Sequence, residues 1–183
     1  MATYVDTTEL EAGLESILAA PKDEGVVHLV VRRPRTDERE VLDEGFLSLE
    51  EGLRGDDWLS HATRASTDGV PDPETQLTLM SSRVIDLLTG DRSRWPLAGD
   101  QLFVDLDLTP ENLPPGTRLR VGEATIEVSS EPHTGCAKFT ARFGDAAIRF
   151  VNSPSGRAMR LRGMHARVVE PGAVRPGDAI RKL

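Results

Sequence analysis

The chain contains a single cysteine, Cys136, within the segment EPHTGCAKFTARFG at residues 131–144. Thr134 is a preferred helix N-cap residue and Gly144 suits the position after a helix, so the segment predicts a helix of about ten residues. Cys136 would then lie in the first turn, where free backbone amides and the helix dipole favour negative charge. Lys138 and Arg142 would add positive charge nearby. This pattern is typical of a thiolate that attacks a substrate, carries sulfur or binds a metal.

Other interpretations of these residues remain open. Phe139 and Phe143 follow Cys136 by three and seven positions, so the cysteine could instead belong to a buried helix face. His133 could be a general base, a metal ligand or a polar turn residue, since a single His-x-x-Cys pair lacks the further ligands of a metal site. As a base it would make Cys136 the nucleophile of a hydrolase, but only if the chain folds back. The other histidines are interpreted as structural or surface residues: His28, His61 and His165.

The net charge of −8 is unevenly distributed. Residues 1–130 contain 12 lysines and arginines against 26 aspartates and glutamates, whereas residues 131–183 contain 10 against 4. The acidic total argues against general nucleic-acid binding. The basic C-terminal segment predicts either a solvated face that complements the acidic remainder or a local anion site, because guanidinium groups match phosphate oxygens.

Length and composition indicate one domain outside the membrane. A chain of 183 residues can bury one good hydrophobic core. A lone cysteine cannot form an internal disulfide, and no apolar run reaches the roughly 18 residues of a membrane span. The first residues lack the pattern of a secretory signal. We therefore expect a cytoplasmic protein without membrane or nucleic-acid partners.

Short apolar segments punctuated by glycine and proline dominate the chain. Residues 8–18 predict an amphipathic helix with Thr8 and Glu11 as its capping box. Residues 61–75 predict an exposed loop. Strands are expected within residues 25–34, 39–49, 77–82, 100–108, 117–121, 124–129, 161–169 and 178–183. Short helices are expected at residues 83–91 and 145–154. The order predicts a mostly β barrel or folded sheet with peripheral helices.

Several of these segments, taken in order, resemble the MOSC domain, the module found at the C-terminus of molybdenum cofactor sulfurases and also as small separate proteins. The matching pieces are EGLRGDD at 51–57, LTPENLPPG at 108–116, PGTRLRVGEATIEVS leading to Cys136, KFTARFG, and GRAMRLRGMHARVVEPGAVRPGDAI. The resemblance covers roughly residues 25–183 and implies a MOSC-type β-barrel. We accordingly expect one MOSC-like domain over 1–183, with 1–22 as a helical extension and 23–183 as the barrel.

The resemblance implies that Cys136 carries persulfide sulfur or ligates molybdenum, and that a basic pocket binds a molybdenum-pterin cofactor. The cofactor-binding residues expected on this ground are Lys138, Arg142, Arg157, Arg160, Arg162, Asn112, Glu111 and Asp56, with Cys136 and His133 as catalytic residues. The sequence departs from many relatives in having Gly135, not proline, before the cysteine. The family is also associated with pyridoxal phosphate binding, but no pyridoxal-binding, iron-sulfur or flavin segment accompanies the module here. A cysteine desulfurase or redox partner is therefore expected to be a separate protein.

Two functions follow from these observations. The first is a MOSC protein that binds the molybdenum-pterin cofactor or carries sulfur on Cys136, with reduction of N-hydroxylated compounds as the reaction that the resemblance implies. The second is a non-catalytic module that binds a small anion or a partner, with Cys136 buried and inert.

Overall fold

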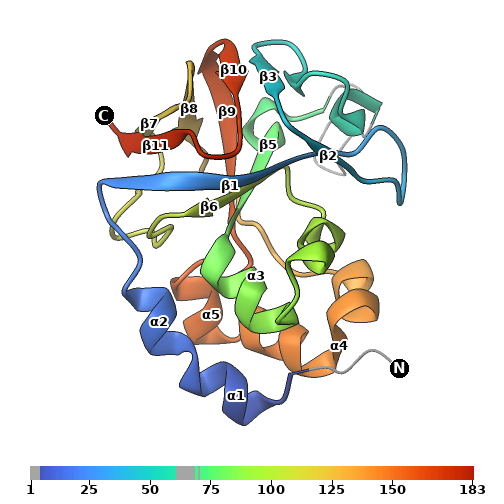
Figure 1. The fold of residues 1–183 in the computed structure, drawn as a ribbon, viewed down its shortest axis with the longest axis vertical. Coiled ribbons are helices and arrows are strands. Elements are labelled where there is room, and N and C mark those ends of the chain that lie inside the picture. Colours follow the sequence, from blue (N-terminus) through green and yellow to red (C-terminus); the bar gives the residue numbers. More distant parts are fainter. Residues whose placement is uncertain (1–4, 61–68, 70) are drawn as a thin grey trace.

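The protein consists of a β-barrel with a layer of helices covering one end (Figure 1). The computed structural model describes residues 5–60, 69 and 71–183, so most of the loop predicted at 61–75 lies outside the described residues. The strands are β1 (Glu24–Arg32), β2 (Glu40–Leu42), β3 (Gly45–Ser48), β4 (Gly52–Leu53), β5 (Leu77–Ser81), β6 (Leu102–Asp105), β7 (Arg118–Val121), β8 (Ala124–Val128), β9 (Met164–Glu170), β10 (Gly172–Val174) and β11 (Ala179–Lys182).

Seven strands close into a ring in the order β1–β6–β5–β9–β8–β7–β11, and β11 pairs again with β1. Closure removes the unpaired edges that an open sheet would expose. β2 extends the sheet from β1, while β10, β3 and β4 form a separate small sheet. This arrangement confirms the predicted barrel with peripheral helices.

One connection in the barrel is a parallel crossover. β5 and β6 are parallel neighbours, and parallel neighbours need a long connection. Helix α3 (Ser82–Thr89) and the 3₁₀-helix η3 (Arg92–Ala98) supply it. The connection therefore places η3 and the residues that follow it beside the helical layer.

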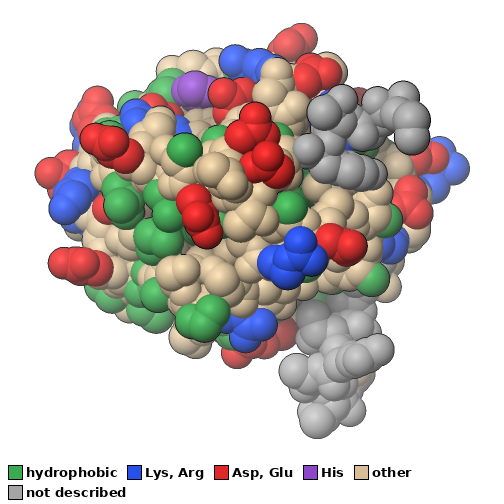
Figure 2. All heavy atoms as spheres, turned by 90° about the horizontal axis from the view of Figure 1, so that it is seen from below, with side chains coloured by type: hydrophobic (Ala, Val, Ile, Leu, Met, Phe, Trp, Pro, Cys, Tyr) green, Lys and Arg blue, Asp and Glu red, His purple; other side chains and the backbone are tan. Residues whose placement is uncertain are grey.

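The remaining helices are α1 (Thr7–Ala12), α2 (Leu14–Leu18), α4 (Ala137–Asn152), α5 (Pro154–Ala158), and the short η1 (Asp57–Ser60) and η2 (Pro73–Thr75). Figure 2 views the helical end and shows acidic side chains spread among smaller apolar areas. No helix within residues 5–60, 69 and 71–183 has the length and apolar character needed to span a membrane.

The side chains divide into two cores because neighbouring strand residues point to opposite faces. On β5 and β6, Leu79 and Leu102 fill the barrel interior, whereas Met80 and Phe103 face the helices. Both strands are thus buried on two faces, which explains why residues 77–81 are all buried. Phe139 and Phe143 of α4 join the second core, so this core fixes the helix that follows Cys136.

Several local predictions are corrected by the structure. The first helix is capped by Asp6 and Glu9, not by Thr8 and Glu11, and it breaks near Gly13 into α1 and α2. Pro154 ends one helix but also begins α5, because proline is well tolerated in a first helical turn. Strand β10 lies in a segment that was predicted to be only a connection.

Gly163, directly before β9, has a φ of +102°. A Cβ atom there would strike the backbone carbonyl of Leu79, whereas Gly177, with a φ of +94°, has open space around it. We expect Gly163→Ala to lower the free energy of unfolding by about 2 kcal/mol or more, from backbone strain together with overpacking. Gly177→Ala should cost about half as much, because it carries the strain alone. Chemical denaturation measures both, and equal losses would contradict the clash.

Candidate functional site

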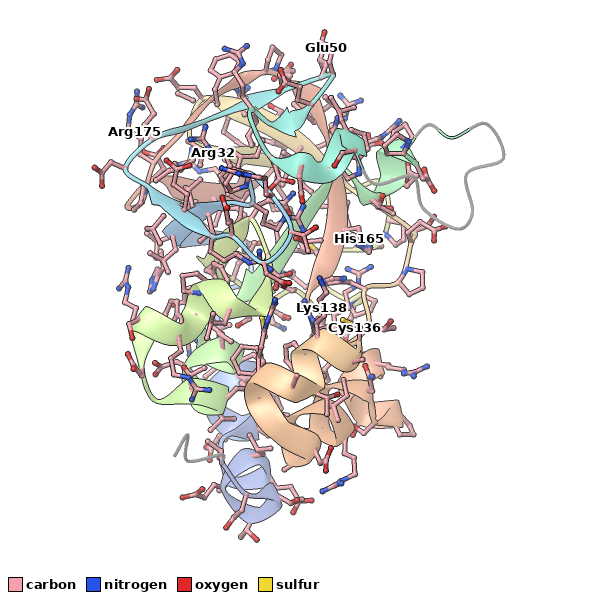
Figure 3. All side chains as sticks on the ribbon, turned by 90° about the vertical axis from the view of Figure 1, so that its right-hand side faces the viewer. Arg32, Glu50, Cys136, Lys138, His165 and Arg175 are labelled. Carbon is pink, nitrogen blue, oxygen red and sulfur yellow. The ribbon has the colours of Figure 1, made fainter. Side chains whose placement is uncertain are left out.

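Cys136 is the N-cap residue of α4, and its side chain is exposed. The interpretation of this cysteine as a buried core residue is therefore wrong, although Phe139 and Phe143 are buried as that interpretation required. Figure 3 shows Cys136 and Lys138 together at the start of α4, with His165 of β9 above them.

The residue before the cysteine is held by a pair of hydrogen bonds. The Gly135 amide donates to Asn152 Oδ1 at 3.0 Å, and Asn152 Nδ2 donates to the Gly135 carbonyl at 3.1 Å. A side chain at position 135 would collide with Ile148. This close approach keeps the segment extended, so the helix begins after Cys136 and not after Thr134. The predicted N-cap is thus wrong by two residues, and Cys136 occupies the cap position next to the free amides of the first turn without a side-chain hydrogen bond to them.

Gly144 interrupts α4 with a φ of 88°. The interruption separates a first helical segment, 137–143, from a second, 145–152. The prediction that the helix after the cysteine ends at Gly144 is confirmed, because only glycine adopts this backbone conformation without strain.

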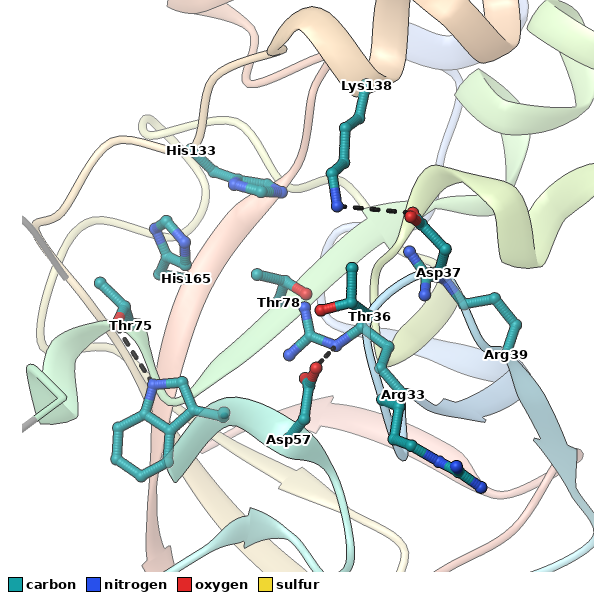
Figure 4. Close-up of a pocket in the computed structure, with 12 residues that line it drawn as sticks. Arg33, Thr36, Asp37, Arg39, Asp57, Thr75, Thr78, His133, Lys138 and His165 are labelled. Carbon is teal, nitrogen blue, oxygen red and sulfur yellow. Dashed lines mark hydrogen bonds and ion pairs between the residues drawn. The ribbon is translucent and has the colours of Figure 1, made fainter. Parts of the chain in front are cut away.

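A cavity of about 280 Å³ opens next to the start of α4 (Figure 4). It is called the basic cavity here because its lining includes four cationic side chains and only two carboxylates. The residues that line it are Arg33, Arg35, Thr36, Asp37, Arg39, Asp57, Trp58, Thr75, Thr78, His133, Lys138 and His165. Lys138 Nζ lies 3.4 Å from Asp37 Oδ1 across its rim. The excess of cations suits an anionic ligand.

Arg33 is fixed in the wall of the basic cavity by Asp56. Its Nε and Nη2 atoms donate to the two Asp56 oxygens at 3.0 and 2.7 Å, and its Nη1 donates to the Gly99 carbonyl at 3.0 Å. Burial alone would lower the pKa of Arg33, but the hydrogen bonds and charge of Asp56 raise it. The predicted residue Asp56 is itself buried and acts by positioning Arg33.

Behind the cysteine segment lies a buried charged group, called the Asp100 cluster here, formed by Asp100, Arg162 and His133. Arg162 Nη1 donates to both Asp100 oxygens, at 3.0 and 2.7 Å, and Nη2 donates to the Ala98 carbonyl at 3.0 Å. His133 Nε2 lies 3.0 Å from Asp100 Oδ1. Burial would raise the pKa of Asp100, but Arg162 and the His133 hydrogen bond outweigh burial and lower it, so the carboxylate stays charged.

The same surroundings keep His133 neutral. Burial, and next the charge of Arg162, lower the pKa of His133 to about 3. At pH 7 its contact with Asp100 is therefore a hydrogen bond donated by Nε2–H, which leaves Nδ1 as an acceptor. His165 Nδ1 lies 3.2 Å from the Glu131 carbonyl and must donate to it, which leaves Nε2 free to accept. The two rings lie 4.5 Å apart and both line the basic cavity, so they offer acceptor nitrogens and no charge.

A second cavity, also of about 280 Å³, lies on the other side of His133 and is called the arginine cavity here. Its lining combines arginines with prolines and small residues: Pro110, Ser130, Glu131, Pro132, His133, Thr134, Val151, Gly156, Arg157, Arg160, Arg162, Gly163 and Met164. The residues that flank Cys136 thus reach both cavities, since Thr134 lines the arginine cavity and Lys138 lines the basic cavity.

The predicted cofactor-binding residues do not form one group. Lys138 lines the basic cavity, whereas Arg157, Arg160 and Arg162 line the arginine cavity. Arg142 lines neither and instead donates to the Leu97 carbonyl at 2.8 Å and to Asp37 Oδ1 at 2.7 Å.

Glu111 and Asn112 lie on the loop before β7, away from both cavity linings. Glu111 is exposed. Asn112 Nδ2 donates to the Lys22 and Asp107 carbonyls, and Asn112 Oδ1 accepts from Lys182 Nζ at 2.9 Å. The side chain of Asn112 is therefore engaged in holding the loop.

The site residues that lie far from the cysteine were not predicted from the sequence. They are Arg33, Arg35, Arg39, Asp100 and His165. The segment RPRTDER at 33–39, directly after a strand, was the available signal. Asp100 offered none, because an acidic residue after glycine resembles an ordinary turn.

The MOSC domain model matches residues 73–181 of this chain. The chain belongs to the MOSC domain family. The matched region includes Cys136, the Asp100 cluster and His165, whereas the arginines at positions 33–39 lie before it. No curated protein matches the chain.

Solved structures share the MOSC fold. The YuaD protein from Bacillus subtilis is 19% identical with a TM-score of 0.63, covering 86% of this chain and 94% of its own. YiiM from Escherichia coli is 23% identical with a TM-score of 0.54, covering 86% and 69%. YiiM from Geobacillus stearothermophilus is 15% identical with a TM-score of 0.55, covering 87% and 75%. At these identities the likeness extends to the fold and no further.

The neutral state of His133 makes stability depend on pH. Its pKa is about 3 in the folded MOSC domain against an ordinary value of 6.5, so acid protonates the unfolded chain first and favours unfolding. Lowering the pH from 7 to 5 should therefore reduce the free energy of unfolding by about 2 kcal/mol through this residue. We expect His133→Gln to flatten the dependence of unfolding free energy on pH by that amount, as measured by urea denaturation. Parallel curves for the variant and the wild type would contradict the assignment.

Proposed function

We propose that this MOSC protein binds a molybdenum-pterin cofactor in the basic cavity, with Cys136 as the thiolate ligand of the metal. The observation that carries the proposal is the exposed Cys136 at the N-cap of α4, two residues before Lys138, which lines the basic cavity together with three arginines. Cys136 itself is not among the described lining residues of that cavity. Thiolate sulfur is a soft ligand that suits such metals, and cationic side chains suit a phosphate. Family membership supports the choice of cofactor.

The residues present fit such a group. Arg33, Arg35 and Arg39 bring guanidinium donors to the basic cavity, and Thr36, Thr75 and Thr78 are among the polar residues that line it. A volume of about 280 Å³ is close to the lower end of ordinary cofactor and ligand pockets. Within the described part of the chain no three His, Cys, Asp or Glu side chains gather as a metal site, so the other ligands of the metal would come from the bound group.

Each residue then has a stated role. Lys138 and the arginines of the basic cavity neutralise the phosphate. His133 and His165 accept hydrogen bonds through their free nitrogens and add no charge. When bound, the cofactor would supply two-electron redox chemistry suited to reducing N-hydroxylated compounds, with electrons from a separate redox partner. That reaction rests on family analogy.

Sulfur transfer through Cys136 is a second candidate, and the exposure of the thiol favours it. A carrier cysteine has to reach the persulfide of a donor such as a cysteine desulfurase, and an exposed N-cap position permits that encounter. A Cys136–His133 hydrolase has less support, because burial and the charge of Arg162 lower the pKa of His133 to about 3, which makes it too weak a base to activate a thiol at neutral pH.

The cofactor role predicts the metal content of the purified protein. The chain should copurify with molybdenum and pterin from a host that makes the cofactor. Cys136→Ala should reduce the molybdenum content by about tenfold or more, because even the loss of a residue that supports a metal ligand typically lowers metal affinity by about tenfold. Lys138→Gln should lower the pterin content, while Arg149→Gln, an exposed site outside both cavities, should change neither. Equal molybdenum in wild type and Cys136→Ala would discard the ligand role.

The sulfur-carrier role predicts a covalent product. Incubation of the apoprotein with a cysteine desulfurase and free cysteine should add one sulfur atom to Cys136, seen by intact mass and reversed by a reducing thiol. Cys136→Ser serves as the control and should gain no mass. An unmodified wild-type protein under conditions that load a known acceptor would remove this candidate.

A further inference from the structure

The arginine cavity has a chemistry that the proposed function does not use. It lies between residues 130–134, helix α5 and the segment that leads into β9. His133 is the one described residue that lines both this cavity and the basic cavity. A ligand here would therefore be held by other side chains than a ligand in the basic cavity.

Arg160 is a half-buried cation without a carboxylate partner among the described residues. Its Nη1 atom donates to the carbonyls of Leu108 and Leu113, at 3.3 and 2.7 Å, which leaves the rest of the guanidinium fork available. Burial lowers the pKa of Arg160, the direction expected when a guanidinium loses water and gains no opposing charge. Its backbone has a φ of 50°, which costs free energy in a residue other than glycine.

Two further arginines line the same cavity. Arg157 is exposed, donates from Nε to the Asn152 carbonyl at 3.0 Å, and forms no ion pair with a described residue. The Arg162 side chain is only 7% exposed, and its Nε atom has no hydrogen-bond partner. Glu131 is the only acidic residue among the described lining. The cavity thus holds unused donors, whereas Arg33, Arg35 and Lys138 of the basic cavity are paired with carboxylates.

The rest of the lining is apolar. Pro110, Pro132, Val151 and Met164 line the cavity together with the arginines. A bare inorganic ion would leave this surface uncovered, whereas a small molecule with a carboxylate and an apolar body would satisfy both kinds of lining. We propose that the arginine cavity binds a small organic acid, whose carboxylate is held by Arg157 and Arg160 and whose body lies against the prolines, Val151 and Met164. This site does not depend on the proposed cofactor.

Benzoate tests the proposal on the cofactor-free protein. In an amide NMR titration of the labelled chain, benzoate should shift the signals of Gly156 and Gly163, which line the cavity, in a saturable way. Arg157→Gln and Arg160→Gln should each weaken binding by about tenfold, the effect of losing a charge-assisted hydrogen bond. Arg149→Gln and Lys138→Gln, which change charges outside this cavity, should leave the affinity unchanged.

Arg157→Gln keeps the test decisive if Arg160→Gln unfolds the protein, because Arg157 is exposed and makes a single hydrogen bond. Unchanged benzoate affinity in the folded arginine variants would overturn the proposal. The absence of saturable shifts up to about 10 mM benzoate, about ten times the 1 mM dissociation constant of a weak complex, would also overturn it. So would shifts confined to the signals around Lys138. Inorganic phosphate is the second probe, and phosphate binding as tight as benzoate binding would overturn the assignment to an organic acid.

Discussion

The Asp100 carboxylate has no exposed surface, and its charge is balanced inside the protein by Arg162. Removing either partner would leave the other charge buried and unpaired, which would lower the free energy of unfolding by about 3 to 5 kcal/mol. The pair joins the segment before β6 to the segment before β9, and the hydrogen bond from His133 adds the cysteine segment. Three stretches distant in the sequence are thereby held in one place, and the wall shared by the two cavities is fixed.

The basic cavity repeats this arrangement on its other side, where buried Asp56 fixes Arg33. In both cases a carboxylate that touches no ligand cavity orients a side chain that does. Cys136 differs, because it is exposed and is positioned by the two hydrogen bonds between the Gly135 backbone and the Asn152 side chain. The MOSC domain thus combines hydrogen-bonded cationic walls with an accessible thiol, and the cofactor proposed above would use the walls for its phosphate and the thiol for its metal.

The barrel could be predicted from sequence because glycine and proline mark its turns and because its strands are rich in valine and leucine. The helix after Cys136 could also be predicted, but its start could not, since the Gly135–Asn152 hydrogen bonds join positions 17 residues apart. The division of the predicted arginines between two cavities follows from tertiary packing alone. Asp100 and His165 enter the site from separate parts of the chain, and local patterns contain no information on such encounters.

The pairing of β1 with β11 brings Glu24 opposite Arg181 and Gly25 opposite Ile180. Contacts between positions so far apart form slowly, because a long loop has to close first. During synthesis the barrel cannot close until β11 has emerged from the ribosome, so residues Glu24–Val26 of β1 lack this partner while all the strands between β1 and β11 are made. The nascent chain is therefore exposed to wrong strand pairing between the synthesis of β1 and that of β11, and chaperones that shield strand edges would act on β1 during that interval.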